Sequence, residues 1–365
     1  ITRLFKCTNA CLSYFQDRKM RESLRRLASE EGMERTVGNY RRVRVELLDG
    51  DHITIDLDRK SRGEDLLDKV CDSLDVEERD YFGLLHTQRG DPRVWVDLER
   101  RLSKAFRNEP WDVKFAVKFY PPEPSELRDE NARYQIGLAV RRDLIEGRLT
   151  CSAITYALLA SYILQAELGD YEDSHMSPSL LSKHRVAPLS ALTPDLEAKL
   201  EELYKKHKGQ TPAEAELNYL ENAKRLALYG AEIHSVQDSE DVDISLAICA
   251  KRDRYIIDFI STTIQIPTPK ICYNKRAYTL KLRASEFDEF ETHLTFRLPS
   301  TRACKKLWRC SVENHMFFRR EFPVKVQRVS GFPRLGSRRL SCRRTLRQLR
   351  DADPPPLTAS VHAHW

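Results

Sequence analysis

The side chains best suited to catalysis or metal binding are ten histidines and nine cysteines, and neither set forms a recognisable motif. The chain contains no Cys-x-x-Cys pair, no His-Glu-x-x-His motif, no Gly-x-Ser-x-Gly elbow and no glycine-rich phosphate loop. The odd number and irregular spacing of the cysteines argue against a disulfide framework or a zinc module. We therefore expect a non-enzymatic protein of a reducing compartment, with no catalytic residue, no metal and no cofactor.

Positive charge is concentrated at the end of the chain. Residues 321–365 carry a net charge of +6, equal to that of the whole chain, so residues 1–320 are neutral overall. A neutral body argues against a nucleic-acid-binding protein, because such a protein carries its positive charge on the folded domain. A polybasic segment is attracted to an anionic membrane leaflet instead. The arginines that we assign to this contact are Arg334, Arg338, Arg339, Arg343 and Arg344.

One serine of the basic segment is a candidate for regulation. Ser341 follows Arg338-Arg339-Leu340, which is the Arg-Arg-x-Ser arrangement that basophilic kinases prefer. A phosphate adds about −1.5 to −2 charges at neutral pH, so phosphorylation of Ser341 is expected to release the segment from the membrane. The plain alternative is a chance serine in a solvated, arginine-rich linker.

The first patterned unit spans residues 41–122, after a charged linker at 1–40. Alternating apolar residues on both sides of Asp49-Gly50 predict a β-hairpin. Ser61 and Glu64 have the spacing of a capping box and predict the start of a helix. Strands are expected at Tyr81–Leu85, Val94–Val96 and Val113–Phe119. This order of elements is that of a ubiquitin-like β-grasp fold.

Two further units follow before the basic tail at 321–365, which is expected to be mostly disordered. Residues 123–235 are helical: helices are predicted at Leu127–Glu146 and Ala153–Leu168, and a third starts at Thr211-Pro212 and ends at Gly230. Residues 236–320 combine strands with one closing helix, as in pleckstrin and phosphotyrosine-binding sandwiches. The predicted elements are Val242–Ile248, Tyr255–Ile260, Thr262–Ile266, Tyr278–Leu282, Leu294–Leu298 and the helix Thr301–Arg319.

This succession of a ubiquitin-like, a helical and a pleckstrin-like unit resembles the FERM module. Several segments are similar to FERM motifs, in the same order and at plausible spacing: Asp80–Leu84, Val117–Pro122, Arg133-Tyr134, Arg141–Leu149, Gln165–Tyr171, Tyr219–Gly230 and Cys304–Arg319. The basic segment after them resembles the FERM-adjacent segment of the band 4.1 branch. The resemblance implies a multi-domain α+β cloverleaf whose middle lobe is all-α and similar to acyl-CoA-binding protein.

The resemblance also implies a function. A band 4.1 protein is a non-enzymatic adaptor that links membrane proteins to the cortical cytoskeleton at the cytoplasmic face of the plasma membrane, including cell junctions. The implied partners are cytoplasmic tails of transmembrane proteins, anionic phospholipids such as phosphoinositides, actin and spectrin, membrane-associated scaffold proteins and calmodulin. The alternative is the N-terminal targeting module of a larger FERM enzyme, either a tyrosine phosphatase or a Rho exchange factor.

Three sites are expected by analogy with the family. An acidic box that would bind a basic receptor tail comprises Glu77, Glu78, Asp80 and Tyr81. A peptide groove is expected where a peptide adds to the edge of the strand Tyr278–Arg283 beside the last helix, with Tyr278, Lys281, Arg309 and Val312 at the groove. The segment Ala223–Asp238 corresponds to a calmodulin-binding region, but it has few basic residues and is predicted to be a core helix.

Overall fold

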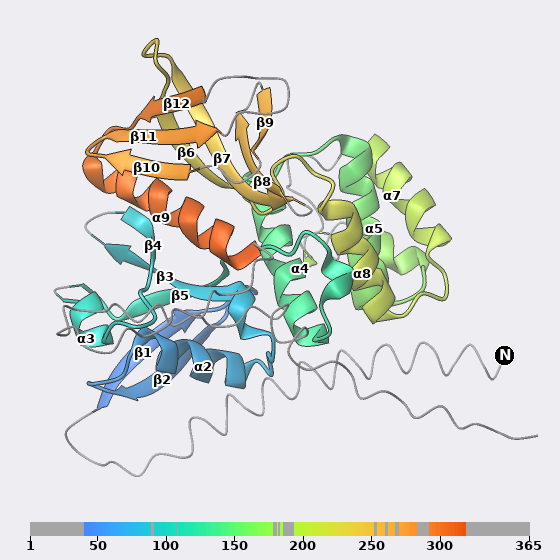
Figure 1. Ribbon diagram of the computed structural model, residues 1–365. Coiled ribbons are helices and arrows are strands. Elements are labelled where there is room, and N and C mark those ends of the chain that lie inside the picture. Colours follow the sequence, from blue (N-terminus) through green and yellow to red (C-terminus); the bar gives the residue numbers. More distant parts are fainter. Residues whose placement is uncertain are drawn as a thin grey trace, which may run out of the picture.

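The computed structural model describes residues 40–88, 91–107, 109–177, 181, 183–184, 193–251, 254–259, 262–266, 270–282 and 292–318. These residues form three lobes, each with its own kind of layer (Figure 1). A sheet with a helix on one face makes the first lobe, a helical bundle makes the second, and a second sheet covered by helix α9 makes the third. Within these ranges, no helix is both long and apolar enough to cross a membrane.

The first lobe is a five-stranded mixed sheet in the order β2-β1-β5-β3-β4. Strand β1 pairs antiparallel with β2 and parallel with β5, which is the β-grasp arrangement expected from the sequence. Helix α2 packs its apolar stripe against this sheet. The elements are β1 (Tyr40–Glu46), β2 (His52–Asp58), α2 (Gly63–Ser73), η1 (Arg79–Tyr81), β3 (Phe82–Gln88), β4 (Asp91–Trp95), α3 (Leu102–Ala105) and β5 (Asp112–Val117).

Turn chemistry explains two boundaries of this lobe. The β1–β2 hairpin is confirmed, and its turn includes Gly50 at φ +94°, a conformation that favours glycine. The predicted Ser61–Glu64 capping box is wrong by one residue. Helix α2 begins at Gly63, and the Asp65 carboxylate accepts the backbone N–H of Arg62 at 2.7 Å.

The second lobe is a bundle in which α5 is the central, buried helix. Helix α5 coincides with the predicted range, whereas α7 was not predicted. The helix that starts at Thr211 ends at Ala223, so the predicted end at Gly230 is wrong. Gly230 closes the turns that follow, at φ +64°. The elements are η2 (Pro124–Glu126), α4 (Glu130–Ile145), α5 (Ala153–Leu168), η3 (Asp173–Met176), α7 (Pro194–Lys206) and α8 (Pro212–Ala223).

The third lobe contains seven hydrogen-bonded strands in the order β10-β11-β12-β6-β7-β8-β9. Helix α9 packs Cys304 and Leu307 onto the apolar face of this sheet. Strands β6 and β10 were not predicted. The elements are β6 (Glu232–Gln237), β7 (Asp243–Lys251), β8 (Arg254–Phe259), β9 (Thr262–Ile266), β10 (Lys270–Asn274), β11 (Ala277–Leu282), β12 (Thr292–Arg297) and α9 (Thr301–Phe318).

Helix α9 also joins the third lobe to the first, and Figure 1 shows it lying between the two sheets. The Lys306 ammonium lies 3.1 Å from an Asp91 carboxylate oxygen of β4. Lys118, just after β5, pairs with Glu313 at 2.9 Å. The ring of Phe317 stacks on that of Phe119 with centroids 4.1 Å apart. These contacts hold the face of α9 that points away from its own sheet against the first lobe.

Candidate protein-binding site

Strand β10 is one of the two edge strands of the third-lobe sheet among the described strands, β9 being the other, and it lies beside α9. Its hairpin to β11 closes at the pair Asn274–Ala277 around a two-residue turn. A two-residue hairpin closes on a hydrogen-bonded pair, and such pairs alternate along an antiparallel ladder. Ile271 and Tyr273 therefore direct their backbone N–H and C=O groups away from β11, toward the outer edge of the sheet.

Aromatic side chains cover the gap between β10 and α9. The Trp308 indole N–H of α9 donates to the Ile271 carbonyl at 3.4 Å, which agrees with the outward direction of that carbonyl. The rings of Tyr273 and Trp308 lie 5.1 Å apart, and Tyr273 is 36% exposed. Val312 is half-buried one helical turn after Trp308. An edge strand beside an apolar, aromatic surface is the geometry of strand addition.

The structure corrects the predicted groove. Strand β11 is flanked by β10 and β12, so no peptide can add to its edge. Tyr278 is fully buried, and its hydroxyl lies 2.8 Å from Ser311 Oγ in the core. Arg309 bonds Glu313 on the face of α9 that meets the first lobe. The side chain of Lys281 lies outside the described residues. Of the predicted set, Val312 lies on α9 one helical turn after Trp308, the residue that contacts β10.

The acidic box is partly occupied by contacts between the first and second lobes. The backbone N–H groups of Glu77 and Glu78 donate to the Asp129 carboxylate at 2.8 and 3.3 Å. The side chain of Glu77 is exposed, but Glu78 is only 5% exposed, so its predicted role in receptor binding is contradicted. Tyr81 packs its ring edge-on against Phe317 of α9 at 5.4 Å, and Asp80 is half-buried. Only Glu77 presents a fully accessible carboxylate to a partner.

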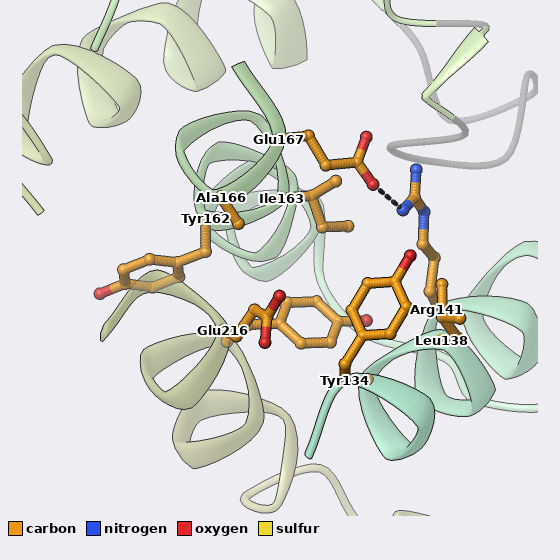
Figure 2. Close-up of a pocket in the computed structure, with 10 residues that line it drawn as sticks. Tyr134, Leu138, Arg141, Tyr162, Ile163, Ala166, Glu167 and Glu216 are labelled. Atoms are coloured by element: carbon orange, nitrogen blue, oxygen red, sulfur yellow. Dashed lines mark hydrogen bonds and ion pairs between the residues drawn. The ribbon is translucent and has the colours of Figure 1, made fainter. Parts of the chain in front are cut away.

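The helical lobe has a small, open pocket between α4, α5 and α8, with a cavity volume of about 40 Å³. Figure 2 shows Arg141 of α4 and Glu167 of α5 joined across it, with an N···O distance of 2.6 Å. Burial opposes the charge on Glu167, but the hydrogen bond from His184 and the charge of Arg141 outweigh it and lower the pKa of Glu167. Tyr134, Tyr162 and Tyr219 supply aromatic walls. The lining is mostly apolar, which suits binding rather than catalysis.

One Ser–His pair in the described residues has the composition of a nucleophile and its base. Ser161 Oγ lies 2.8 Å from His207 Nε2, and both side chains are buried. The serine hydroxyl donates to the Leu158 carbonyl at 2.7 Å, so the imidazole must donate its own N–H to Ser161. Burial lowers the pKa of His207, and its ring stacks on Tyr162. The pair is therefore structural. The hydroxyl proton of Ser161 is already bonded to the Leu158 carbonyl, and both side chains are buried away from any substrate.

Two other sites expected from the sequence find no support in the described geometry. The basic segment, with Arg334, Arg338, Arg339, Ser341, Arg343 and Arg344, lies outside the described residues. The segment Ala223–Asp238 is not a helix, because α8 ends at Ala223 and the chain continues through turns into β6. The prediction of a core helix there is wrong, and a calmodulin-binding helix is not formed either.

Comparisons with known proteins agree with the three-lobe architecture. Residues 45–108 match the FERM N-terminal domain, 122–234 the FERM central domain and 267–326 the FERM C-terminal PH-like domain. The FERM domain of Drosophila Merlin, solved in complex with its C-terminal domain, superposes with a TM-score of 0.66 at 22% identity, covering 76% of this chain and 96% of that one.

Relatives of higher identity carry the name of one branch of that family. A protein 4.1 homolog from Drosophila melanogaster is 45% identical over 81% of this chain, and human band 4.1-like protein 3 is 42% identical over 85%. Protein 4.1 from dog is 39% identical over 85%. The chain spans only 17%, 28% and 38% of the length of these three relatives. It belongs to the FERM family, in its band 4.1 branch.

Proposed function

We propose that this chain is the membrane-facing module of a non-enzymatic adaptor that binds cytoplasmic tails of transmembrane proteins and connects them to the cortical cytoskeleton. The observation that carries this proposal is the β10 edge beside α9, where outward-facing backbone groups border an aromatic surface. The band 4.1 names of its relatives support the same role. Actin and spectrin are the proposed cytoskeletal partners, and the plasma membrane is the proposed location.

A tail peptide would bind as an additional strand. It would pair with the outward N–H and C=O groups of Tyr273 and with the outward N–H of Ile271, whose carbonyl accepts the Trp308 indole N–H. One of its side chains would rest on Trp308 and Val312. Backbone pairing supplies affinity for many sequences, and the aromatic surface supplies selectivity. Trp308 is held by its hydrogen bond to Ile271, so the surface is ordered before a peptide arrives and little ordering entropy is lost on binding.

Two charged regions would assist this binding. Glu77 would attract basic residues of a receptor tail, although an exposed ion pair contributes only about 0–1 kcal/mol. The arginines of the basic segment would attract anionic phospholipids at about 1 kcal/mol each. Phosphorylation of Ser341 would oppose that attraction. Each of these contributions depends on salt, whereas strand addition at β10 does not.

The proposal is tested by replacing one outward backbone N–H. Tyr273→Pro removes the N–H that a peptide would use but spares the ladder to β11, and proline is tolerated at such edge positions. Tyr273→Thr removes the aromatic ring but keeps the N–H, so it is the matched control. Affinities for a panel of synthetic cytoplasmic-tail peptides are measured by fluorescence polarisation, and folding of both variants is checked by thermal denaturation.

We expect Tyr273→Pro to weaken peptide binding about tenfold or more, which corresponds to about 1.4 kcal/mol. Tyr273→Thr should lose less, because strand pairing remains. Equal affinity of the folded proline variant and the threonine control would show that tails do not add to β10. Failure of every tail peptide to bind the unmodified chain would remove the adaptor proposal itself.

A further inference from the structure

Three metal-ligating side chains from two elements converge on the inner side of the third lobe. Glu232 and His234 are two residues apart on strand β6, so both point to the same face of the sheet. Cys310 reaches them from α9. Glu232 Oε1 lies 3.6 Å from His234 Nε2, and Glu232 Oε2 lies 3.4 Å from Cys310 Sγ. One ligand atom from each residue falls within 4.8 Å of the other two.

One ring nitrogen of His234 is buried without a hydrogen bond among the described residues. Its side chain is only 10% exposed, and its Nε2 atom is buried with no hydrogen-bond partner among the described residues. A buried polar atom without a partner costs free energy, so it calls for a ligand that the protein itself does not supply.

We propose that Glu232, His234 and Cys310 form a binding site for a divalent transition-metal ion, with Zn²⁺ the best fit to the donor set. Thiolate, imidazole and carboxylate are the three protein ligands that zinc prefers. With Zn–S of about 2.3 Å and Zn–N or Zn–O of about 2.0–2.1 Å, a tetrahedral site has ligand–ligand separations of about 3.3–3.6 Å. In the structure Glu232 reaches His234 and Cys310 through different carboxylate oxygens, at 3.6 and 3.4 Å, and one ligand atom from each of the three residues lies within 4.8 Å of the other two. The ligand atoms would therefore draw closer together around an ion.

The charges around the cluster are compatible with a dication. Metal binding would displace the thiol proton of Cys310, which Glu232 accepts as a hydrogen bond in the metal-free protein, to solvent. The ligands would then carry a charge of −2. The nearby cations are Lys306, Lys118 and Arg93. Lys306 is paired with Asp91 and Lys118 with Glu313, which offsets the charges of the two lysines.

The surroundings of the cluster supply both support and access. Asn314 Nδ2 lies 3.5 Å from Cys310 Sγ and 3.1 Å from the Cys310 carbonyl, so it would orient and stabilise the thiolate. Glu232 is 23% exposed and provides a route for an ion and a water as fourth ligand. A bound ion would cross-link β6 to α9, which also contacts the first lobe. The site is therefore expected to stabilise the helix that joins the two lobes.

The test uses the full chain and Co²⁺ as a spectroscopic substitute for Zn²⁺. We expect one tightly bound Co²⁺ per chain with a thiolate-to-cobalt charge-transfer band and the intense visible bands of tetrahedral cobalt, both displaced by Zn²⁺. Cys310→Ala should abolish the charge-transfer band. Cys304→Ala is the matched control, because it also removes a buried thiol from α9 but lies outside the cluster. Asn314→Ala should weaken cobalt affinity about 10–100-fold.

Either of two results would overturn the proposal: no thiolate band in the unmodified chain, or a band that survives in Cys310→Ala. Should Cys310→Ala fail to fold, His234→Gln decides the question, with the exposed His293→Gln as its control. Loss of the tetrahedral cobalt spectrum in His234→Gln alone supports the site, and an unchanged spectrum refutes it. A rise in melting temperature on adding Zn²⁺, absent in both cluster variants, would confirm that the ion stabilises the fold.

Discussion

The hydrogen bond between Tyr278 and Ser311 can be removed from either side, and we predict that the two substitutions lower the stability of the protein by different amounts. Ser311 Oγ donates to the Leu307 carbonyl at 2.9 Å and lies 2.8 Å from the Tyr278 hydroxyl, which must then donate to it. Both side chains are fully buried. Tyr278→Phe removes the donor and leaves Ser311 bonded to the helix. Ser311→Ala leaves the tyrosine hydroxyl buried without a partner.

The magnitudes follow from this asymmetry. Losing a buried hydrogen bond with no orphaned group costs about 0.5–1.5 kcal/mol, whereas orphaning a buried polar group costs about 1–3 kcal/mol. For Ser311→Ala, a cost of about 2 kcal/mol corresponds to a melting temperature about 4–8 °C lower. Tyr278→Phe should lower it by roughly half as much. The double variant should resemble Tyr278→Phe, because no hydroxyl is then orphaned.

Thermal denaturation of the single and double variants measures these shifts, and tail-peptide affinity is measured in parallel. Because Tyr278 lies in the core and not at the β10 edge, neither substitution should change peptide binding. A Tyr278→Phe variant that is less stable than Ser311→Ala would refute the assigned direction of the hydrogen bond. A folded Tyr278→Phe variant with weakened peptide binding would refute the corrected position of the groove.

Three other outcomes follow from named contacts. Gly230→Ala should lower the melting temperature, since a Cβ at φ +64° costs about 1–2 kcal/mol and would lie 2.4 Å from Tyr120 Cβ. Burial opposes ionisation of Glu313, but the charges of Lys118 and Arg309 outweigh it and lower the pKa of Glu313. The ionised Glu313 therefore stabilises the fold above the ordinary glutamate pKa, and this stabilisation is lost as pH falls through the lowered pKa. Lys118→Met should make the melting temperature fall less on the acid side in a pH series. Glu77→Ala should weaken binding of a basic tail peptide at low salt without changing stability.

Sequence patterns predicted the fold where periodicity and turn chemistry agree. The β1–β2 hairpin has alternating apolar residues on both sides of Asp49-Gly50, and α5 is apolar over most of its length. Helix α7 was missed although Thr193 and Pro194 supply a capping residue and a first-turn proline. The signal was present there, but the apolar stripe of Leu196, Leu200 and Tyr204 is narrow among charged residues.

The third-lobe sites could not be found in this way, because the sequence does not show which side chains of β6 face inward or that β10 is an edge strand. On β6 the exposed residues are Ile233 and Ser235, while the polar Glu232 and His234 face inward with Val236. An alternation argument places the apolar residue inside and so hides the metal ligands. The β10–β11 turn contains Lys275 at φ +51° in place of a glycine, so the sequence does not indicate a hairpin. Without that turn, β11 was mistaken for the edge strand.

The different surfaces of α9 account for most of the function that we infer. Cys304 and Leu307 fix it to its own sheet, and Lys306 and Glu313 fix it to the first lobe. Trp308 faces the β10 edge, and Cys310 faces β6. Because Cys310 and Trp308 lie on the same helix, an ion that holds Cys310 against β6 would also constrain the position of Trp308 at the β10 edge. By thermodynamic linkage, any increase in peptide affinity caused by Zn²⁺ must be matched by an equal increase in Zn²⁺ affinity caused by the peptide.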